Sequence, residues 1–278
     1  MRSRWPYIWG LTLLLLLAIG KFGYDYFYFD VNKRETFIPK PTGPIEPLYR
    51  QIEVPAMSPS APTTQEVQQA LVDLGIPAGE VDGKWGQRTR QGFCIWRELT
   101  GREANRNLPI EMEARAIINA ANFQRVTENS SGSALNSKKY QALKIPEDFI
   151  VGLNISKTCQ SAVWVKDKAR TNFKVTIAST GAPGLETDSG YFKVGWKVDR
   201  WYESIAYPDG WMYRPQFFNS GQAIHGSEYD TWVWWYPASH GCVRMLGKDI
   251  DELWAAGFGV GSKIYVYGAW NPFTQDPK

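Results

Sequence analysis

The feature that most constrains this chain is an apolar run near its start, from Trp5 to Phe22, which follows Arg2 and Arg4. At 1.5 Å per helical residue, such a run is about long enough to cross the ~30 Å hydrocarbon core of a membrane. Aromatic residues crowd both ends of the run, as they do at membrane interfaces, and the arginines indicate a cytoplasmic N-terminus. We therefore expect residues 1–30 to form a single-pass signal-anchor in the cytoplasmic membrane, with the rest exported to the periplasm or outside the cell.

A cleaved signal peptide is the alternative interpretation of the same run, because Ala18 and Gly20 could form a small-residue cleavage site. Either interpretation exports the body of the chain. Residues 31–62 are rich in proline and lack apolar periodicity, so we expect an extended linker there.

Charge and cysteine content exclude several classes of protein. The formal net charge of +3 comes without a basic stripe, which argues against nucleic-acid binding. Three cysteines and two histidines, with no CxxC, argue against a disulfide scaffold and against a structural zinc site. Because Cys94 and Cys159 fall in different predicted domains, we expect them not to pair.

Residues 63–126 carry three helical patterns and are expected to form a small domain. The first helix should open at Thr63 or Thr64, and the third should run around Glu111 to Ala121. The apolar positions of the first two helices recur at helical spacing: Val67, Leu71 and Leu74, then Phe93, Trp96 and Leu99. A Leu-Gly ends the first helix, and an Asp-Gly-x-Trp-Gly-x-x-Thr segment opens the second.

This arrangement resembles the peptidoglycan-binding-like three-helix domain over some forty residues. The matching positions are Asp82, Gly83, Trp85, Gly86 and Thr89. The resemblance implies binding to glycan strands of the cell wall. The alternative is a spacer domain in which the Asp-Gly turn and the tryptophan are purely structural.

After a second linker, residues 127–147, we expect the main domain over residues 148–270. Alternating apolar segments, such as Phe173, Val175 and Ile177, indicate half-buried strands. With short spacings and one late helix, this indicates a mainly-β sandwich. The whole chain is thus expected to be an α+β multidomain protein with a mainly-β sandwich domain, a three-helix domain and an N-terminal transmembrane helix.

The residues that carry chemistry are close together near the C-terminus. A cysteine nucleophile needs a nearby base, because a free thiol is mostly protonated at neutral pH. Both histidines of the chain lie within seventeen residues of Cys242. The two segments concerned are Ala223-Ile224-His225-Gly226 and Ser239-His240-Gly241-Cys242-Val243-Arg244.

His-Gly, a loop, then Ser-His-Gly-Cys-Val-Arg resembles the signature of the L,D-transpeptidase catalytic domain of the YkuD type. The resemblance extends over about Phe149 to Gly268 and includes an upstream Thr187-Asp188-Ser189-Gly190-Tyr191-Phe192. The family commonly has proline where this chain has Asp188, which loosens that turn. Some branches carry Asn where this chain has Arg244.

The resemblance implies that Cys242 is the nucleophile and His225 the general base. The carbonyl of Gly226 is expected to orient the imidazole, while His240 and Gly241 shape the oxyanion site with Cys242. The expected substrate-binding residues are Arg244, Ser239 and Tyr213. Substrate anchoring and bracing of the loop remain equal alternatives for Arg244. The Trp232 to Tyr236 loop is either a packed flap or a sugar platform, and Thr187 is interpreted as a turn residue.

The resemblance implies an L,D-transpeptidase that cleaves the terminal D-Ala from peptidoglycan stem peptides through a thioester and transfers the acyl group to an amine. It would serve cell-wall biogenesis and cell shape and needs neither metal nor organic cofactor. Its expected partners are peptidoglycan and the membrane. The alternatives are an L,D-carboxypeptidase or other wall hydrolase, and a non-catalytic wall-binding protein.

Overall fold

The computed structural model of the protein describes residues 60–129, 143 and 145–271. The predicted membrane anchor and most of the two predicted linkers lie outside these residues. Within the described part, no helix combines the length and the apolar character that crossing a bilayer requires.

The first described segment forms three helices, as predicted: α2 (Thr64–Asp73), α3 (Gln87–Leu99) and α4 (Glu111–Asn129). Helix α2 begins with a capping box, because Thr63 Oγ1 accepts the Glu66 N–H and the Glu66 carboxylate accepts the Thr63 N–H. Helix α3 is buried on nearly all sides, including Phe93, Ile95 and Trp96. A helix with so little exposed surface must be covered by more than its two helical neighbours.

The second described segment is mostly β, as predicted. Its strands are β1 (Gly152–Ser156), β2 (Ser161–Val165), β3 (Phe173–Ser179), β4 (Gly190–Lys193), β5 (Trp196–Lys197), β6 (Trp201–Glu203), β7 (Trp211–Asn219), β8 (Gln222–Gly226), β9 (Val243–Met245) and β10 (Lys263–Tyr267). They are joined in the order β4-β10-β1-β2-β3-β9-β8-β7-β5, and β6 pairs with β7.

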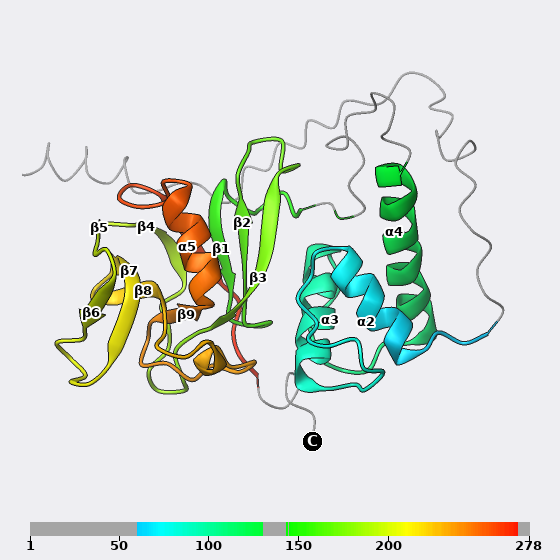
Figure 1. The fold of residues 1–278 in the computed structure, drawn as a ribbon, viewed down its shortest axis with the longest axis horizontal. Coiled ribbons are helices and arrows are strands. Elements are labelled where there is room, and N and C mark those ends of the chain that lie inside the picture. Colours follow the sequence, from blue (N-terminus) through cyan, green and yellow to red (C-terminus); the bar gives the residue numbers. More distant parts are fainter. Residues whose placement is uncertain (1–59, 130–142, 144, 272–278) are drawn as a thin grey trace, which may run out of the picture. The chain divides into compact units, whose positions relative to one another are not determined.

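The described strands therefore form one curled sheet, where the sequence analysis predicted a sandwich. Strand β3 belongs to both halves of this sheet, because Phe173 to Ile177 pairs with β2 while Ala178 and Ser179 pair with β9. Helix α5 (Gly247–Ala255) packs on the sheet through Ile250 and Leu253 (Figure 1). The buried side chains of both halves share one cluster with this helix, as the facing layers of a sandwich would.

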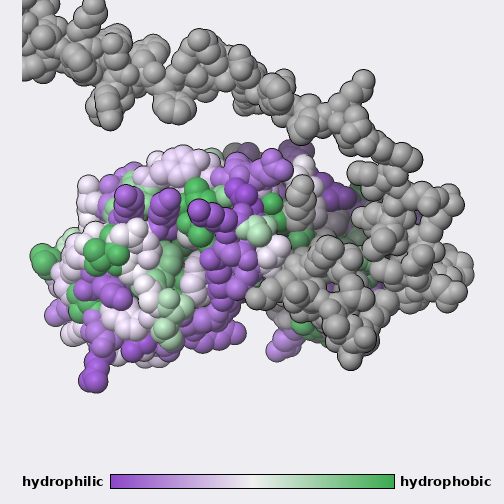
Figure 2. Space-filling view, turned by 90° about the horizontal axis from the view of Figure 1, so that it is seen from above, coloured by the Kyte–Doolittle hydropathy of each residue, from purple (hydrophilic) through white to green (hydrophobic). Residues whose placement is uncertain are grey.

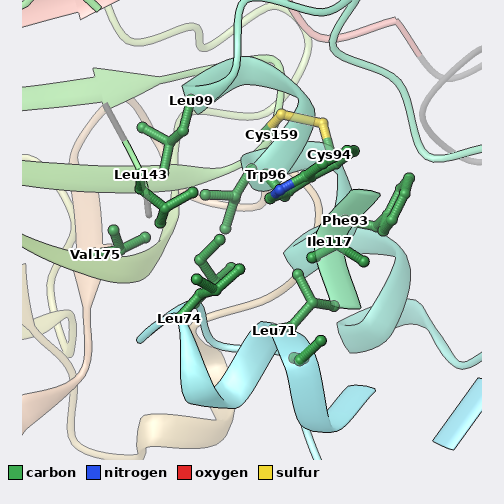
Figure 3. Close-up of a cluster of buried hydrophobic side chains, with 14 of the residues drawn as sticks. Leu71, Leu74, Phe93, Cys94, Trp96, Leu99, Ile117, Leu143, Cys159 and Val175 are labelled. Atoms are coloured by element: carbon green, nitrogen blue, oxygen red, sulfur yellow. A yellow bond between two sulfur atoms is a disulfide. The ribbon is translucent and has the colours of Figure 1, made fainter. Parts of the chain in front are cut away.

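A second hydrophobic cluster combines side chains of the helices with side chains of the sheet (Figure 3). Leu74, Trp96 and Leu99 come from the helical segment, and Val175 comes from β3. The helical segment and the sheet therefore share a core, and the sheet is what covers the remaining side of α3.

The expectation that Cys94 and Cys159 do not pair was wrong. They form a disulfide between α3 and the turn that follows β1, with their Cα atoms 5.6 Å apart (Figure 3). The prediction assumed that two domains hold their cysteines apart. Because the helix packs directly on the sheet, residues 65 positions apart in the sequence become neighbours.

Replacing both Cys94 and Cys159 by serine should destabilise the protein by about 4 kcal/mol, the loop-closure value for a crosslink spanning 65 residues. The measurement is denaturant unfolding, made in a Cys242→Ala background so that no free thiol exchanges with the bond. The background protein with dithiothreitol is the control. Equal midpoints with and without reductant would show that the crosslink contributes nothing.

Candidate active site

Parallel pairing of β8 with β9 brings the two reactive side chains to one face. The register places Ile224 opposite Val243 and His225 opposite Arg244, and Cys242 directly precedes β9. Because side chains alternate along a strand, His225 and Arg244 share a face with Cys242. These three side chains line one cavity of about 480 Å³.

The turn between β7 and β8 holds the Cys242 thiol. The two central residues of the turn, Ser220 and Gly221, both have positive φ, as tight hairpins favour. This geometry aims the Gly221 carbonyl at Sγ, which donates to it over 3.8 Å, while Sγ accepts the N–H of Ala223 at 3.4 Å. The thiol is therefore held by two backbone groups, one in the turn and one in β8.

His225 is buried and has a defined orientation. Its Nδ1 lies 2.7 Å from the carbonyl oxygen of Gly226, a contact in which the nitrogen must be the donor. Gly226 thus makes the contact that the resemblance implies, and Nε2 is left as the basic nitrogen. Burial lowers the pKa of His225 to about 4, with a further lowering by the Arg244 charge, so the ring is neutral at pH 7.

The nucleophile candidate is also neutral in the resting protein. Burial raises the pKa of Cys242 above its usual range, although the Ala223 N–H and the Arg244 charge oppose that rise. A neutral thiol beside a neutral imidazole favours proton transfer during attack over a preformed thiolate–imidazolium pair.

The loop before Cys242 is tied to its surroundings by short side chains. Ser239 Oγ donates to the Cys242 carbonyl and accepts the Gly241 N–H at 3.2 Å. Gly241 has a φ of +111°, which favours glycine at this position. Ser239 is predicted to bind substrate, but its hydroxyl is engaged within the loop.

Thr187 contributes more than the turn role that the sequence suggests. It is fully buried, its Oγ1 donates to the Gly241 carbonyl at 2.9 Å, and the same oxygen accepts the Gly181 N–H at 2.9 Å. Gly181 cannot carry a side chain, because an added Cβ would lie 2.0 Å from the Leu185 carbonyl oxygen. The sequence does not indicate that Thr187 is buried, because a Thr-Asp-Ser-Gly segment is also typical of an exposed turn.

The remaining predicted site residues divide between the cavity wall and the outside. Arg244 lines the cavity and donates from Nη1 to the Ala238 carbonyl at 3.3 Å, so it both braces the loop and faces the site. His240 is exposed, lines the cavity and stacks on Tyr207 with ring centroids 4.3 Å apart. The structure does not bring Tyr213 to the cavity, since its hydroxyl donates to Asp251 at 2.8 Å.

Aromatic side chains form much of the cavity wall around this polar centre. Trp196 stacks on Phe217 with centroids 3.7 Å apart and is still 47% exposed. Six aromatic residues of the wall come from β5 to β7, their connections and the later loop: Trp196, Tyr202, Tyr207, Trp211, Phe217 and Trp232. On the face shown in Figure 2, hydrophobic patches lie among hydrophilic ones.

The described residues include no group of three or more histidine, cysteine, aspartate or glutamate side chains placed to hold a metal ion. The cavity itself is lined by the thiol of Cys242, the imidazole of His225 and the guanidinium of Arg244, which suit covalent attack, proton transfer and binding of a negative group.

Comparison with known proteins points to one family. Residues 151–266 match the family described as YkuD, the L,D-transpeptidase catalytic domain. No curated protein sequence matches the chain significantly.

Among solved structures, an L,D-transpeptidase from Xylanimonas cellulosilytica is 24% identical, with 75% of this chain and 96% of that chain covered and a TM-score of 0.48. One from Stackebrandtia nassauensis is 20% identical, with coverages of 76% and 98% and a TM-score of 0.42. One from Mycobacterium tuberculosis is 20% identical, with coverages of 42% and 57% and a TM-score of 0.34.

Alkylation of Cys242 by iodoacetamide should accelerate about tenfold per pH unit from about pH 6 to about pH 9, because the reactive thiolate fraction is set by a raised thiol pKa. The measurement is intact mass against time, with Cys242→Ala as the unreactive control. A plateau between about pH 5 and pH 8 would instead reveal a thiolate–imidazolium pair and contradict the neutral resting state.

Proposed function

We propose that this chain is a cysteine-dependent L,D-transpeptidase of peptidoglycan stem peptides, because residues 151–266 match the YkuD family of L,D-transpeptidase catalytic domains. One observation carries the proposal beyond the family: a thiol and an oriented neutral imidazole line the same cavity as a single guanidinium. That set of groups suits acyl transfer from a substrate with a carboxylate.

The first half-reaction forms a thioester. Nε2 of His225 takes the thiol proton as Sγ of Cys242 attacks the carbonyl carbon that joins the diamino acid to the terminal D-alanine. The C–N bond breaks, and the imidazolium returns the proton to the departing D-alanine amine. In the second half-reaction the same nitrogen removes a proton from an acceptor amine, which attacks the thioester and releases the thiol.

The negative oxygen of the tetrahedral intermediate needs hydrogen-bond donors. The Gly241 N–H already donates to Ser239 Oγ, so we assign the oxyanion site to the backbone N–H groups of His240 and Cys242. Gly241 then serves by its φ of +111°, which shapes the loop that carries both donors.

Arg244 is the proposed anchor for a substrate carboxylate. Its hydrogen bond to Ala238 uses one of five guanidinium donors, and the side chain lines the cavity beside Cys242. Bracing and binding are therefore compatible roles. The released D-alanine and the stem peptide both carry carboxylates that a guanidinium binds well.

The rest of the chain would keep the enzyme near its polymer. We propose that the N-terminal segment anchors it in the cytoplasmic membrane and that the catalytic part acts outside the cytoplasm. Glycan-strand binding by the helical segment would raise the local concentration of acceptor strands.

Hydrolysis is the second candidate function. Cys242 keeps partial exposure in its cavity, so water can reach a thioester formed there. In favour of transfer, six aromatic side chains line the cavity and limit the room for water, whereas an oriented amine is the better nucleophile.

Cys242→Ala should abolish turnover of a disaccharide-tetrapeptide, and His225→Ala should reduce it by roughly 10² to 10⁴, the usual contribution of a general base. His240→Ala should cost less, because its ring stacks on Tyr207 at the exposed rim. The measurement is D-alanine release, with circular dichroism to verify folding. Substantial turnover by Cys242→Ala would end the cysteine mechanism, and a larger loss in His240→Ala would reverse the histidine roles.

With disaccharide-tetrapeptide and an added D-amino acid, the main product should be the exchanged tetrapeptide, or a cross-linked dimer when no amine is added. Mass spectrometry of the muropeptides distinguishes these from tripeptide, the product of hydrolysis. Tripeptide alone at every amine concentration would replace the transpeptidase by an L,D-carboxypeptidase.

A further inference from the structure

We propose that Arg88 and Arg106 of the helical segment are positioning residues for the active site, because they hold the loop that walls the cavity. This loop, residues 229–236, is named the flap here, and its Trp232 lines the cavity with Cys242. The kinetic part of the proposal rests on the proposed function, but its structural part does not.

In the described part of the chain, the hydrogen bonds that the catalytic domain itself makes to the flap lie near its two ends, and the Trp235 ring also contacts the Trp270 ring. At the first end, Asp230 Oδ1 accepts the Gly247 N–H at 2.7 Å. At the other, the Tyr236 carbonyl accepts the Ser179 hydroxyl at 2.8 Å. The stretch between these two contacts includes Trp232, which lines the cavity.

The helical segment supplies hydrogen bonds in the middle of the flap. Arg88, on α3, donates from Nη2 to the carbonyl of Val233, the residue after Trp232. It is oriented for this by a second hydrogen bond, from Nη1 to Gln91 Oε1 at 2.8 Å. A charged donor to a backbone carbonyl is among the stronger hydrogen bonds of a protein interior, so this contact fixes the flap next to Trp232.

Arg106 makes the corresponding contact two residues further along. It is fully buried and donates from Nη2 to the carbonyls of Trp235 and Cys159, the latter at 3.2 Å. Its guanidinium also lies 5.5 Å from the Trp235 ring centroid. Arg106 thus connects the flap to Cys159, which also forms the disulfide with Cys94 of α3.

A parallel connection reaches the loop that carries Cys242. Gln91 of α3 donates to the Gln160 carbonyl at 2.6 Å, and the Gln160 side chain accepts the Thr180 N–H at 2.8 Å. The Thr180 carbonyl accepts the N–H groups of Ala238 and Ser239, at 2.9 and 3.0 Å. The helical segment is therefore hydrogen-bonded directly to the flap and connected through Gln160 and Thr180 to the loop that carries Cys242.

The chemical consequence concerns water. A flap held by Arg88 and Arg106 keeps Trp232 at the cavity wall and limits the water that can reach a thioester. Loosening the flap should expose Cys242 and shift the fate of the thioester towards hydrolysis.

The test compares Arg88→Met, Arg88→Lys and Arg115→Met in the full chain. Methionine removes the donors while keeping the apolar length, and lysine restores a single donor. Arg115 is the matched control, because it belongs to the same helical segment and pairs with Glu111. Arg106→Met is measured beside them, but Arg88 carries the test because Arg106 is fully buried.

Two quantities are measured on each variant, in addition to its thermal midpoint of unfolding. The first is the rate of Cys242 alkylation by iodoacetamide, which needs no substrate and stays meaningful if the proposed reaction fails. The second is the ratio of exchanged tetrapeptide to tripeptide at one fixed concentration of D-amino acid. We expect Arg88→Met to raise the alkylation rate roughly fivefold, the factor for loss of one typical hydrogen bond, and to lower the product ratio similarly.

Arg88→Lys should return both readouts part of the way to the wild-type values, and Arg115→Met should leave them unchanged. A change in either readout that is specific to the Arg88 variants supports the proposal. If Arg88→Met matches Arg115→Met in both, or alters only the thermal midpoint, the arginine holds the fold together and does not position the site.

Discussion

The parallel pairing of β8 with β9 is the contact on which the site depends. It is only three residue pairs long, yet it sets His225 and Arg244 side by side and places Cys242 one step before them. Parallel strands cannot be joined by a tight turn, so the chain must leave β8, make a long excursion and return. That excursion is the aromatic loop from Ser227 to Gly241, which supplies part of the wall of the cavity into which the paired residues project.

Burial at this junction sets the protonation states of the pair. It disfavours the charged form of each group, so the pKa of His225 falls to about 4 while the pKa of Cys242 rises. A buried ion pair would need strong hydrogen bonds to both charges. The contacts here are two backbone groups on sulfur and one carbonyl on Nδ1. They orient the two groups, both of which are neutral in the folded protein.

Local signals in the sequence sufficed for the features that depend on neighbouring residues. The capping residue at Thr63, the three helices and the clustering of Cys242 with His225 follow from patterns within about twenty positions. Features that depend on long-range packing did not follow. The Cys94–Cys159 disulfide and the buried Thr187 arise where segments distant in the chain meet. The position of Tyr213 outside the cavity wall did not follow either, because the strand sequence gives no sign of its partner Asp251 on helix α5.

The shared core shows that the helical segment is not an independently packed domain in this protein. A tethered domain that only binds the cell wall would be expected to keep its own core and a polar surface towards its neighbour. Here α3 is buried on nearly all sides, and its cluster continues into β2 and β3 through Val163 and Val175.

Buried polar groups at the same junction, such as the Glu98 carboxyl that accepts the Ser156 hydroxyl at 2.7 Å, would be left unsatisfied if the two parts separated. Burial at this junction raises the pKa of Glu98 to about 7. A junction that is tightly packed, hydrogen-bonded and crosslinked transmits position rather than allowing independent motion. The helical segment is therefore built as a part of the catalytic unit, whatever else it binds.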